Sequence, residues 1–308
     1  MKQNRKDCIK RTTAALMENY TQNPLITPSE SSRLPDVDAI IGVLRELRRV
    51  IFPGYFDGEA FSEDSAEYYV GSKLTKVFET LAEQIETALL YKNSENLSRE
   101  EVAGRAEEIC TGLFQKLPYL QSMLMKDVEA FYDSDPAAKS REEIIFCYPG
   151  LLAIFVYRIA HVLYCAGVPF IPRIMTEHAH SRTGIDINSG AVIGEYFFID
   201  HGTGIVIGET TVIGNHVKIY QGVTLGGIST RGGQALAGKK RHPTIRDNVT
   251  IYSGASILGG NTVIGENAVI GGNAFITESI PADTKVSMKT PELILRDGTR
   301  KNGEANAE

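Results

Sequence analysis

A six-residue hydrophobic repeat dominates the second half of this chain. Aliphatic or aromatic residues recur at every sixth position in two stretches, and Thr211 is the one polar member. The positions are Ile187, Ile193, Ile199, Ile205, Thr211, Val217 and Val223, then Ile245, Ile251, Ile257, Val263, Val269 and Phe275. Neither the 3.6-residue period of an α-helix nor the alternation of a strand produces such a pattern. A repeat sustained this long predicts stacked units that share one core.

A triangular parallel β-helix explains the repeat. Three flat faces of six residues make one coil, and each hexad points one aliphatic side chain into a common core. Glycine tolerates the positive φ that tight corners require, and nineteen of the 29 glycines fall between Gly184 and Gly272. We expect roughly five to six coils, enough to bury a continuous core. Hexapeptide coils are expected to wind left-handed, an exception to the right-handed crossover rule.

The first half of the chain has helical patterns. Apolar residues recur at three- and four-residue spacing over 36–50 and 69–90. Ser98 and Glu101 resemble a capping box that opens a helix over 99–117. Pro118 is expected to end that helix, and a new amphipathic run covers 120–131.

The predicted fold class is therefore α+β multidomain, an N-terminal α-helical domain followed by a left-handed parallel β-helix. We assign residues 1–183 to the helical domain, which serves as scaffold and oligomer contact. Residues 184–286 form the β-helix, and 287–308 a C-terminal tail.

Composition and charge exclude several classes of protein. A net charge of −6 argues against a nucleic-acid binder, which needs a concentrated basic face. The four cysteines lie far apart without a C-x-x-C pair, which favours reduced thiols and a cytoplasmic location. No signal peptide is evident. The apolar stretch 144–171 contains Arg158 and His161, so we expect a buried or interface helix and no membrane span.

The repeat is interrupted once, by the loop 226–243. This loop is polar and glycine-rich, and loops of this length within a compact domain are usually functional. It ends in Lys239-Lys240-Arg241-His242. The Arg241 guanidinium is a fork suited to a carboxylate. A basic run of this kind is more often a solvated charge run, but its place in the inserted loop favours a binding role.

His201 is the candidate general base. Small residues flank it in Asp200-His201-Gly202-Thr203-Gly204 and leave its ring accessible. Asp186 lies somewhat less than one coil earlier and is expected to orient the imidazole and stabilise its protonated form. The alternative is an exposed polar histidine at a corner. A zinc site is disfavoured, because His201, His216 and His242 lack a closely spaced pair, so we expect no metal.

Several longer motifs resemble one enzyme family. They are the runs 186–191, 200–210 and 223–227, Arg241-His242-Pro243, and upstream Asp135-Pro136-Ala137 and Tyr157-Arg158-Ile159-Ala160-His161. Together they resemble serine O-acetyltransferase over roughly residues 131–280. The resemblance implies transfer of an acetyl group from acetyl-CoA to the hydroxyl of L-serine, giving O-acetyl-L-serine for cysteine biosynthesis.

The resemblance also implies roles for individual residues. His201 would accept the hydroxyl proton and Asp186 would orient it. The ammonium and carboxylate of serine would be held by Asp135, Asp200, Arg241 and His242. The coenzyme A arm of acetyl-CoA would pack against Gly226, Gly227, Ser253 and Gly272.

Partners follow from the same resemblance. L-cysteine shares the two charged ends of serine and is expected to be a feedback inhibitor. Sites at the seams between neighbouring β-helices predict a homotrimer or a dimer of trimers. Because the sequence ends in Asn306-Ala307-Glu308 without an isoleucine, we expect no tight complex with O-acetylserine sulfhydrylase through this tail. Two alternatives are a sugar or another small hydroxyl or amine as acceptor, and a β-helix without catalytic activity.

Overall fold

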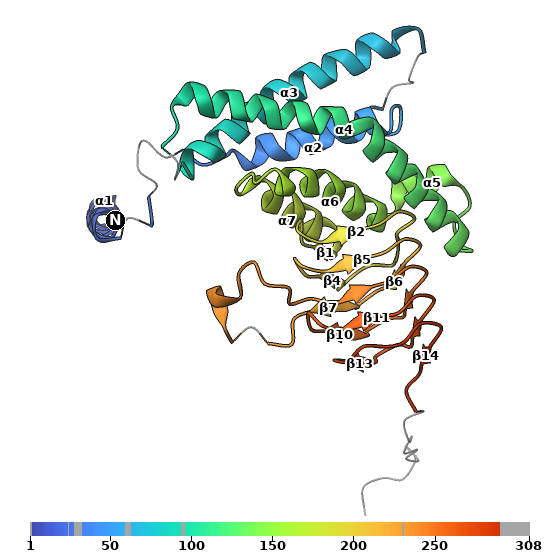
Figure 1. Cartoon of the computed structure of the whole chain (residues 1–308). Coiled ribbons are helices and arrows are strands. Elements are labelled where there is room, and N and C mark those ends of the chain that lie inside the picture. The colour runs from blue at the N-terminus through green and yellow to red at the C-terminus, as the bar shows by residue number, and fades with distance from the viewer. Residues whose placement is uncertain are drawn as a thin grey trace, which may run out of the picture.

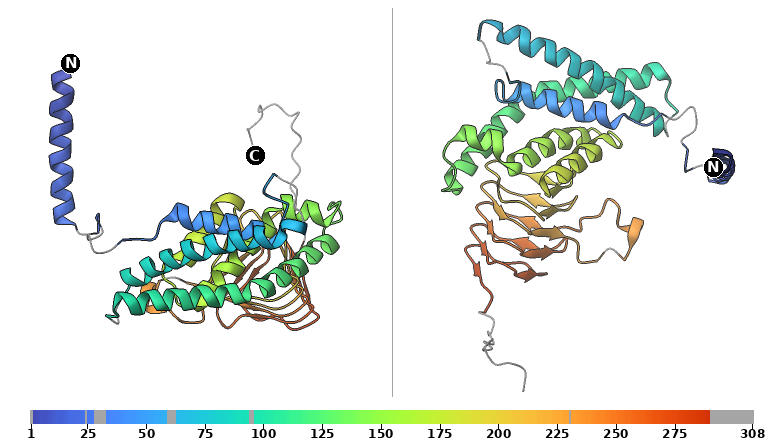
Figure 2. Two further views of the ribbon diagram at one scale, coloured as in Figure 1. Left: turned by 90° about the horizontal axis from the view of Figure 1, so that it is seen from above. Right: turned by 180° about the vertical axis from the view of Figure 1, so that it is seen from behind.

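The computed structural model describes residues 2–23, 25–27, 33–58, 63–93, 96–229 and 231–289. Helices stack above the coils of a parallel β-helix, and α1 stands clear of both (Figures 1 and 2). The helices are α1 Lys2–Gln22, α2 Val37–Ile51, α3 Ala66–Tyr91, α4 Arg99–Ser134, α5 Arg141–Cys147, α6 Pro149–Cys165 and α7 Ile171–Thr183. The predicted order of a helical region followed by a β-helix is confirmed. The sequence interpretation missed α1.

Local sequence signals set the helix ends. Asp36 caps α2, because its side chain accepts hydrogen bonds from the backbone N–H groups of Asp38 and Ala39. The predicted capping box is present at the start of α4, where Ser98 and Glu101 each accept a hydrogen bond from the other's backbone N–H. These caps satisfy N–H groups that have no partner within the helix.

The expectation that Pro118 ends a helix was wrong. One helix, α4, runs from Arg99 to Ser134 with Pro118 inside it. A proline removes one helical hydrogen bond, yet the residues on both sides keep one face buried, with Leu117 6% and Leu120 5% exposed. Burial of that face outweighs the local penalty, and α4 packs against both α3 and the first coil of the β-helix.

The β-helix has three sheets, each built from one strand per coil. The strands are β1 Asp186–Ile187, β2 Val192–Ile193, β3 Phe198–Asp200, β4 Val206–Ile207, β5 Val212–Ile213, β6 Lys218–Tyr220, β7 Thr224–Gly226, β8 Thr244–Ile245, β9 Thr250–Ile251, β10 Ser256–Leu258, β11 Val263–Ile264, β12 Val269–Ile270, β13 Phe275–Ile276 and β14 Lys285–Val286. The sheet orders are β1-β4-β7-β10-β13, β2-β5-β8-β11 and β3-β6-β9-β12-β14, all parallel. Each strand therefore pairs with its equivalent in the next coil.

The register of the core differs from the predicted register at two corners. Between β3 and β4 the chain holds two residues more than a strict hexad allows, so Ile207 and not Ile205 pairs with Ile187, and a second shift follows β10. Ile187, Ile193 and Ile199 point inward as expected, as do Ile245, Ile251 and Ile257. In the last coil the buried residues are Ile264, Ile270 and Ile276, not Val263, Val269 and Phe275, and Phe275 is 71% exposed. The corner between β10 and β11 holds one residue more than a strict hexad allows, which shifts every later side chain by one position.

A buried ion pair joins the helices to the β-helix. The Arg158 guanidinium on α6 donates hydrogen bonds of 2.7 and 2.8 Å to the Asp127 carboxylate on α4. It also donates to the Gly194 carbonyl, and Asp127 accepts from the Phe197 N–H. The predicted buried environment of Arg158 is confirmed, at 3% exposure. Among the described residues no single helix is long and apolar enough to cross a membrane, although the bent pair α5 and α6 meets that test together.

Candidate active site

The candidate site residues lie on two edges of the sheet β1-β4-β7-β10-β13. One edge, here called the histidine edge, is the corner that leads from the sheet of β3 into this sheet. It carries Asp186, Asp200, His201, Ser253 and Gly272. The other, here called the loop edge, leads from this sheet into the sheet of β5. It carries Glu209, Thr210, Gly226, Gly227, Arg241 and His242, together with the inserted loop between β7 and β8.

His201 extends from the histidine edge into solvent. Its backbone has φ 55°, and Gly202 follows with φ 85°, so the chain turns tightly here and presents the imidazole outward. The side chain is 71% exposed, and Nδ1 lies 3.5 Å from Oδ1 of Asp200. Nε2 therefore remains available to a substrate.

Two carboxylates, Asp200 and Asp135, lie near the same tyrosine side chains, and Asp200 also contacts His201. Asp200 ends β3, and Asp135 follows α4, where its Oδ2 accepts a 2.7 Å hydrogen bond from the Tyr148 hydroxyl. Burial, the hydrogen bond to Asp135 and the charges of both aspartates raise the pKa of Tyr148. Burial and the same two charges raise the pKa of Tyr220. The structure thus brings Asp135 and Asp200 together around protonated tyrosines.

Asp186 lies on the same edge, one coil closer to the helices. It begins β1, pairs with Val206 of β4, and has a carboxylate oxygen 3.9 Å from Nη1 of Arg173. In the described part of the chain no hydrogen bond joins Asp186 to His201. The carboxylate that contacts His201 within one chain is Asp200.

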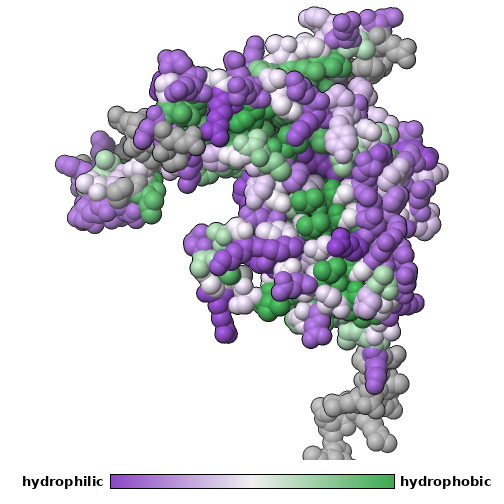
Figure 3. All heavy atoms as spheres, viewed as in Figure 1, coloured by the Kyte–Doolittle hydropathy of each residue, from purple (hydrophilic) through white to green (hydrophobic). Residues whose placement is uncertain are grey.

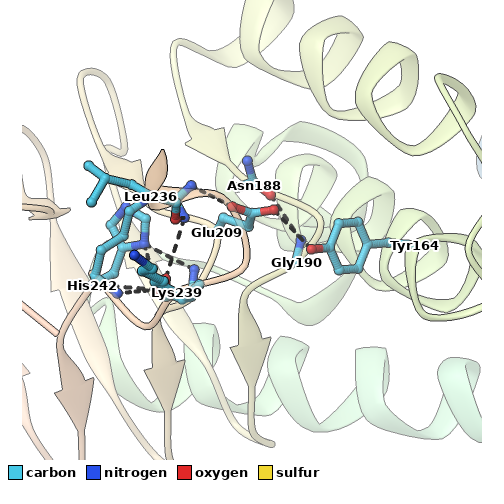
Figure 4. A network of polar contacts seen from close by, with 9 residues as sticks. Tyr164, Asn188, Gly190, Glu209, Leu236, Lys239 and His242 are labelled. Carbon is cyan, nitrogen blue, oxygen red and sulfur yellow. Dashed lines mark hydrogen bonds and ion pairs between the residues drawn. The ribbon is translucent and has the colours of Figure 1, made fainter. Parts of the chain in front are cut away.

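Arg241 lies at the loop edge in a network of polar contacts. Figure 4 shows this network and labels its members Glu209, Leu236 and His242. The Nη2 of Arg241 forms an ion pair with Glu209, and Nη1 donates to the Leu236 carbonyl at 3.3 Å. Glu209 also accepts a 2.9 Å hydrogen bond from the Tyr164 hydroxyl on α6. Burial acts to raise the pKa of Glu209, but Arg241 and Tyr164 outweigh it and the net pKa is lowered. Glu209 is therefore an anion that orients the guanidinium.

His242 is held as a neutral side chain beside Arg241. Burial, followed by the positive charge of Arg241, lowers its pKa to about 4. Its Nδ1 accepts a 3.0 Å hydrogen bond from the Thr210 N–H, so the ring proton lies on Nε2. A Cβ at Gly208 would lie 2.1 Å from the His242 ring. Glycine at this position leaves the space that the imidazole occupies.

The four glycine and serine positions predicted for coenzyme A also divide between the edges. Ser253 and Gly272 are stacked in adjacent coils of the histidine edge, where a Cβ on Gly272 would lie 3.1 Å from the Ser253 carbonyl. Gly226 ends β7 at the loop edge, and Gly227 follows it. A cleft of about 440 Å³ adjoins them, lined by Ile228, Lys240, Gly259, Gly260, Asn261, Thr262, Thr277, Glu278 and Ser279.

Sequence reasoning missed the residues that orient the predicted ones. Glu209, Thr210 and Tyr148 each contact a predicted site residue. Glu209 and Thr210 stand within the run 200–210 that carried the family resemblance. The signal available was charge, because Glu209 is an acid within that run and a guanidinium forms strong paired hydrogen bonds with a carboxylate.

Comparison with known proteins identifies the family. The family model for the serine acetyltransferase N-terminal domain matches residues 59–155. A plasmid serine acetyltransferase of Synechococcus elongatus is 44% identical over 223 residues, which is 70% of each chain. The serine acetyltransferase of Bacillus subtilis is 50% identical over 127 residues, 41% of this chain and 56% of that one.

Solved structures agree with the sequence relatives. Serine acetyltransferase 1 of Entamoeba histolytica in complex with L-cysteine has a TM-score of 0.70 and 37% identity, covering 83% of this chain and 88% of that one. Serine acetyltransferase of Neisseria gonorrhoeae in complex with serine has a TM-score of 0.53 and 28% identity, covering 80% and 95%. The predicted resemblance and fold class are confirmed, and this chain belongs to the serine acetyltransferase family.

Proposed function

We propose that the active site forms between two copies of the chain, where the histidine edge of one meets the loop edge of the next. The chain is an acetyltransferase that acts on the hydroxyl of L-serine. That reaction needs a base, an anion for the ammonium and a cation for the carboxylate. One chain carries the base and the anions at one edge and Arg241 at the other. This separation is the observation that carries the proposal.

A ring of three chains completes every site. A head-to-tail contact joins unlike surfaces, and three such contacts close into a trimer when each chain is rotated by a third of a turn. Val206 and Phe275, on the outer face of the sheet between the two edges, are 39% and 71% exposed. Apolar side chains are also visible on the β-helix beside the inserted loop (Figure 3). Burial of such surface favours association. A dimer of trimers through the helices is the larger assembly we propose.

His201 performs the proton transfer. Its Nε2 accepts the proton of the serine hydroxyl while the hydroxyl oxygen attacks the thioester carbonyl of acetyl-CoA. The tetrahedral intermediate collapses as the C–S bond breaks, and the coenzyme A thiolate receives the proton from the imidazolium. Asp200 contacts Nδ1 and stabilises the imidazolium, and Asp186 on the same edge supplies a further negative charge. General-base catalysis contributes about 10²–10⁴ in rate.

The charged ends of serine fix its orientation. Asp135 and Asp200 attract the ammonium on the histidine edge. On the loop edge Arg241 binds the carboxylate while Glu209 keeps the guanidinium in place. His242 is neutral at physiological pH, since its pKa is about 4, and donates a hydrogen bond from Nε2. The thin arm of acetyl-CoA would lie along Gly226, Gly227, Ser253 and Gly272.

L-cysteine fits the same pocket because it has the same ammonium and carboxylate. The Entamoeba relative has been solved with L-cysteine bound. We propose feedback inhibition that is competitive with serine, and we expect Arg241→Ala to weaken it. A neutral sugar as acceptor would leave both the aspartate pair and Arg241 without a function, so serine is favoured over it.

The first test is thiol release from acetyl-CoA with L-serine, a panel of sugars, or no acceptor. We expect release with serine only and a loss of about 10²–10⁴ in kcat for His201→Asn. His216→Asn is the matched control, because His216 has the same φ of 55° but lies on a different corner, stacked on Tyr196. Asparagine tolerates this conformation, so both variants should fold. Equal activity of the two variants would contradict a role for His201 as base.

Mixing two inactive variants tests the shared site. A trimer assembled from equal amounts of His201→Asn and Arg241→Gln chains places an intact histidine edge against an intact loop edge at about a quarter of the contacts. We expect the mixture to regain up to about that share of wild-type activity after subunit exchange. A site contained in one chain would give none.

A further inference from the structure

A second cluster of cations lies in the helical region, away from both edges. It surrounds a cavity of about 180 Å³ between α2, α6 and α7. The lining residues are Ile41, Leu44, Arg45 and Arg48 from α2, Leu152, Phe155 and Val156 from α6, and His178 and Arg182 from α7. Four of these nine carry or can acquire a positive charge, and none is acidic.

The cations act on one another across this cavity. Burial and then the charge of Arg182 lower the pKa of Arg48 to about 10. Burial, Arg182 and Arg45 lower the pKa of His178. Groups on α2 and α7 that converge in this way repel one another, and partial burial strengthens the repulsion because water screens it less.

Nearby acids do not balance this charge. Glu46 on α2 pairs with Arg49 and Lys73. Glu177 on α7 pairs with Arg173 and is 3.4 Å from His180. Within the described ranges, no hydrogen bond or ion pair involves the side chain of Arg45 or Arg182. Arg48 donates one long hydrogen bond of 3.4 Å to the Ile145 carbonyl and lies over the Phe56 ring.

The geometry points to an anion as the missing partner: we propose that this cavity binds a doubly charged tetrahedral oxyanion, phosphate or sulfate. Guanidinium groups match such oxyanions with paired N–H donors. Pockets for nucleotide-sized or drug-sized ligands measure about 300–1,000 Å³, so a cavity of about 180 Å³ favours the free ion. Leu152, Phe155 and Val156 form an apolar floor that excludes water from one side of the site.

Occupation of the cavity would join α2 to α7. These helices already contact each other, and α7 continues through Gly184 into β1, which begins with Asp186. A bound dianion replaces repulsion between the arginines with attraction to a shared ligand. Because the ligand binds the folded state, it raises the melting temperature, and above the dissociation constant the stabilisation grows with the logarithm of the ligand concentration.

The test is a titration of the full chain with sodium phosphate and, separately, sodium sulfate, at constant ionic strength adjusted with chloride. We expect saturable heat release with one ion bound per chain, a rise in melting temperature, and a rise in the pKa of His178 measured by NMR. ATP is the third arm. Tighter binding of ATP than of phosphate at this cavity would overturn the free-ion assignment.

Charge-removing variants locate the binding. Arg45 and Arg182 are both exposed, so Arg45→Gln and Arg182→Gln together should fold and should weaken phosphate binding at least tenfold. Arg246→Gln, an exposed arginine on the β-helix, is the matched control and should bind as wild type does. Acetyl transfer to serine should be unchanged in both the double variant and the control. Undiminished phosphate binding in the double variant would overturn the proposal. So would the absence of saturable phosphate binding by the wild-type chain at constant ionic strength.

Discussion

The helical region and the β-helix bury their cores in different ways. In the β-helix each strand contacts its equivalent one coil away, so burial repeats along the axis, as at Ile213, Ile245 and Ile264. In the helical region the contacts join segments that have no sequence relation to one another, as α4 does with α3, α5 and α6. The core of the β-helix depends on the six-residue repeat, whereas the core of the helical region depends on contacts between individual pairs of helices. We expect substitutions in the two regions to affect stability and its pH dependence differently.

Loss of the buried ion pair should have the largest effect. Asp127→Ala leaves Arg158 charged and buried at 3% exposure, and we expect the free energy of unfolding to fall by about 3–5 kcal/mol. Glu129→Ala is the matched control on the same helix. Its partner Arg141 is 44% exposed, so the loss should be at most about 1 kcal/mol. Denaturant unfolding measures both, and similar losses would contradict the role assigned to burial.

A cavity in the β-helix should cost less and should depend on the coil. Ile219→Ala in β6 removes a side chain that is 0% exposed and has coils on both sides, and we expect a loss of about 2–4 kcal/mol. Ile276→Ala lies in the last full coil, at 7% exposure, and should cost less because that end can open locally. Hydrogen exchange of the backbone amides around Ile219 and around Ile276 shows whether each substitution opens one end of the β-helix or destabilises the whole protein. Equal losses of stability in the two variants would contradict the view that each coil is stabilised mainly by its neighbouring coils.

A smaller effect is expected on the pH dependence of stability. The folded pKa of His242 is about 4, against an ordinary value of 6.5. Between those values the unfolded chain binds more protons, so stability falls as the pH is lowered from about 6.5 to 4. Water near the loop edge screens the charge of the protonated His242 ring. We therefore expect the free energy of unfolding to fall by about 1–2 kcal/mol over this pH range. His242→Gln should remove that part of the pH dependence, measured by melting temperature in a series of buffers.

His178 provides the corresponding test in the helical region. Its pKa is also lowered, first by burial and then by Arg182 and Arg45, so it too destabilises the folded chain on acidification. We expect His178→Gln to remove a smaller part of the pH dependence than His242→Gln. Saturation with phosphate should reduce the contribution of His178 to the pH dependence of stability and leave the contribution of His242 unchanged. If phosphate changed the His242 contribution and left the His178 contribution unchanged, the positive charge around the cavity would already be balanced within the protein.

Prediction from sequence succeeded where signals are local. The hexad pattern, the capping box at Ser98 and the inserted loop each depend on residues within a few positions of one another, and the structure has all three. Pro118 was misjudged because its local signal is to end a helix, whereas Leu117 and Leu120 on either side are held by contacts with distant helices. A single extra residue between β10 and β11 likewise has no local signature.

The amino-acid sequence by itself determined the class of fold and the chemical groups available, because a period of six and the motifs around His201 and Arg241 are properties of the chain alone. Only the tertiary structure decided that these two residues occupy opposite edges of one sheet, that Glu209 holds Arg241, and that Arg45, Arg48 and Arg182 converge on one cavity. The physical reason is that winding and helix packing bring together residues far apart in sequence, and charge interactions depend on distance in space.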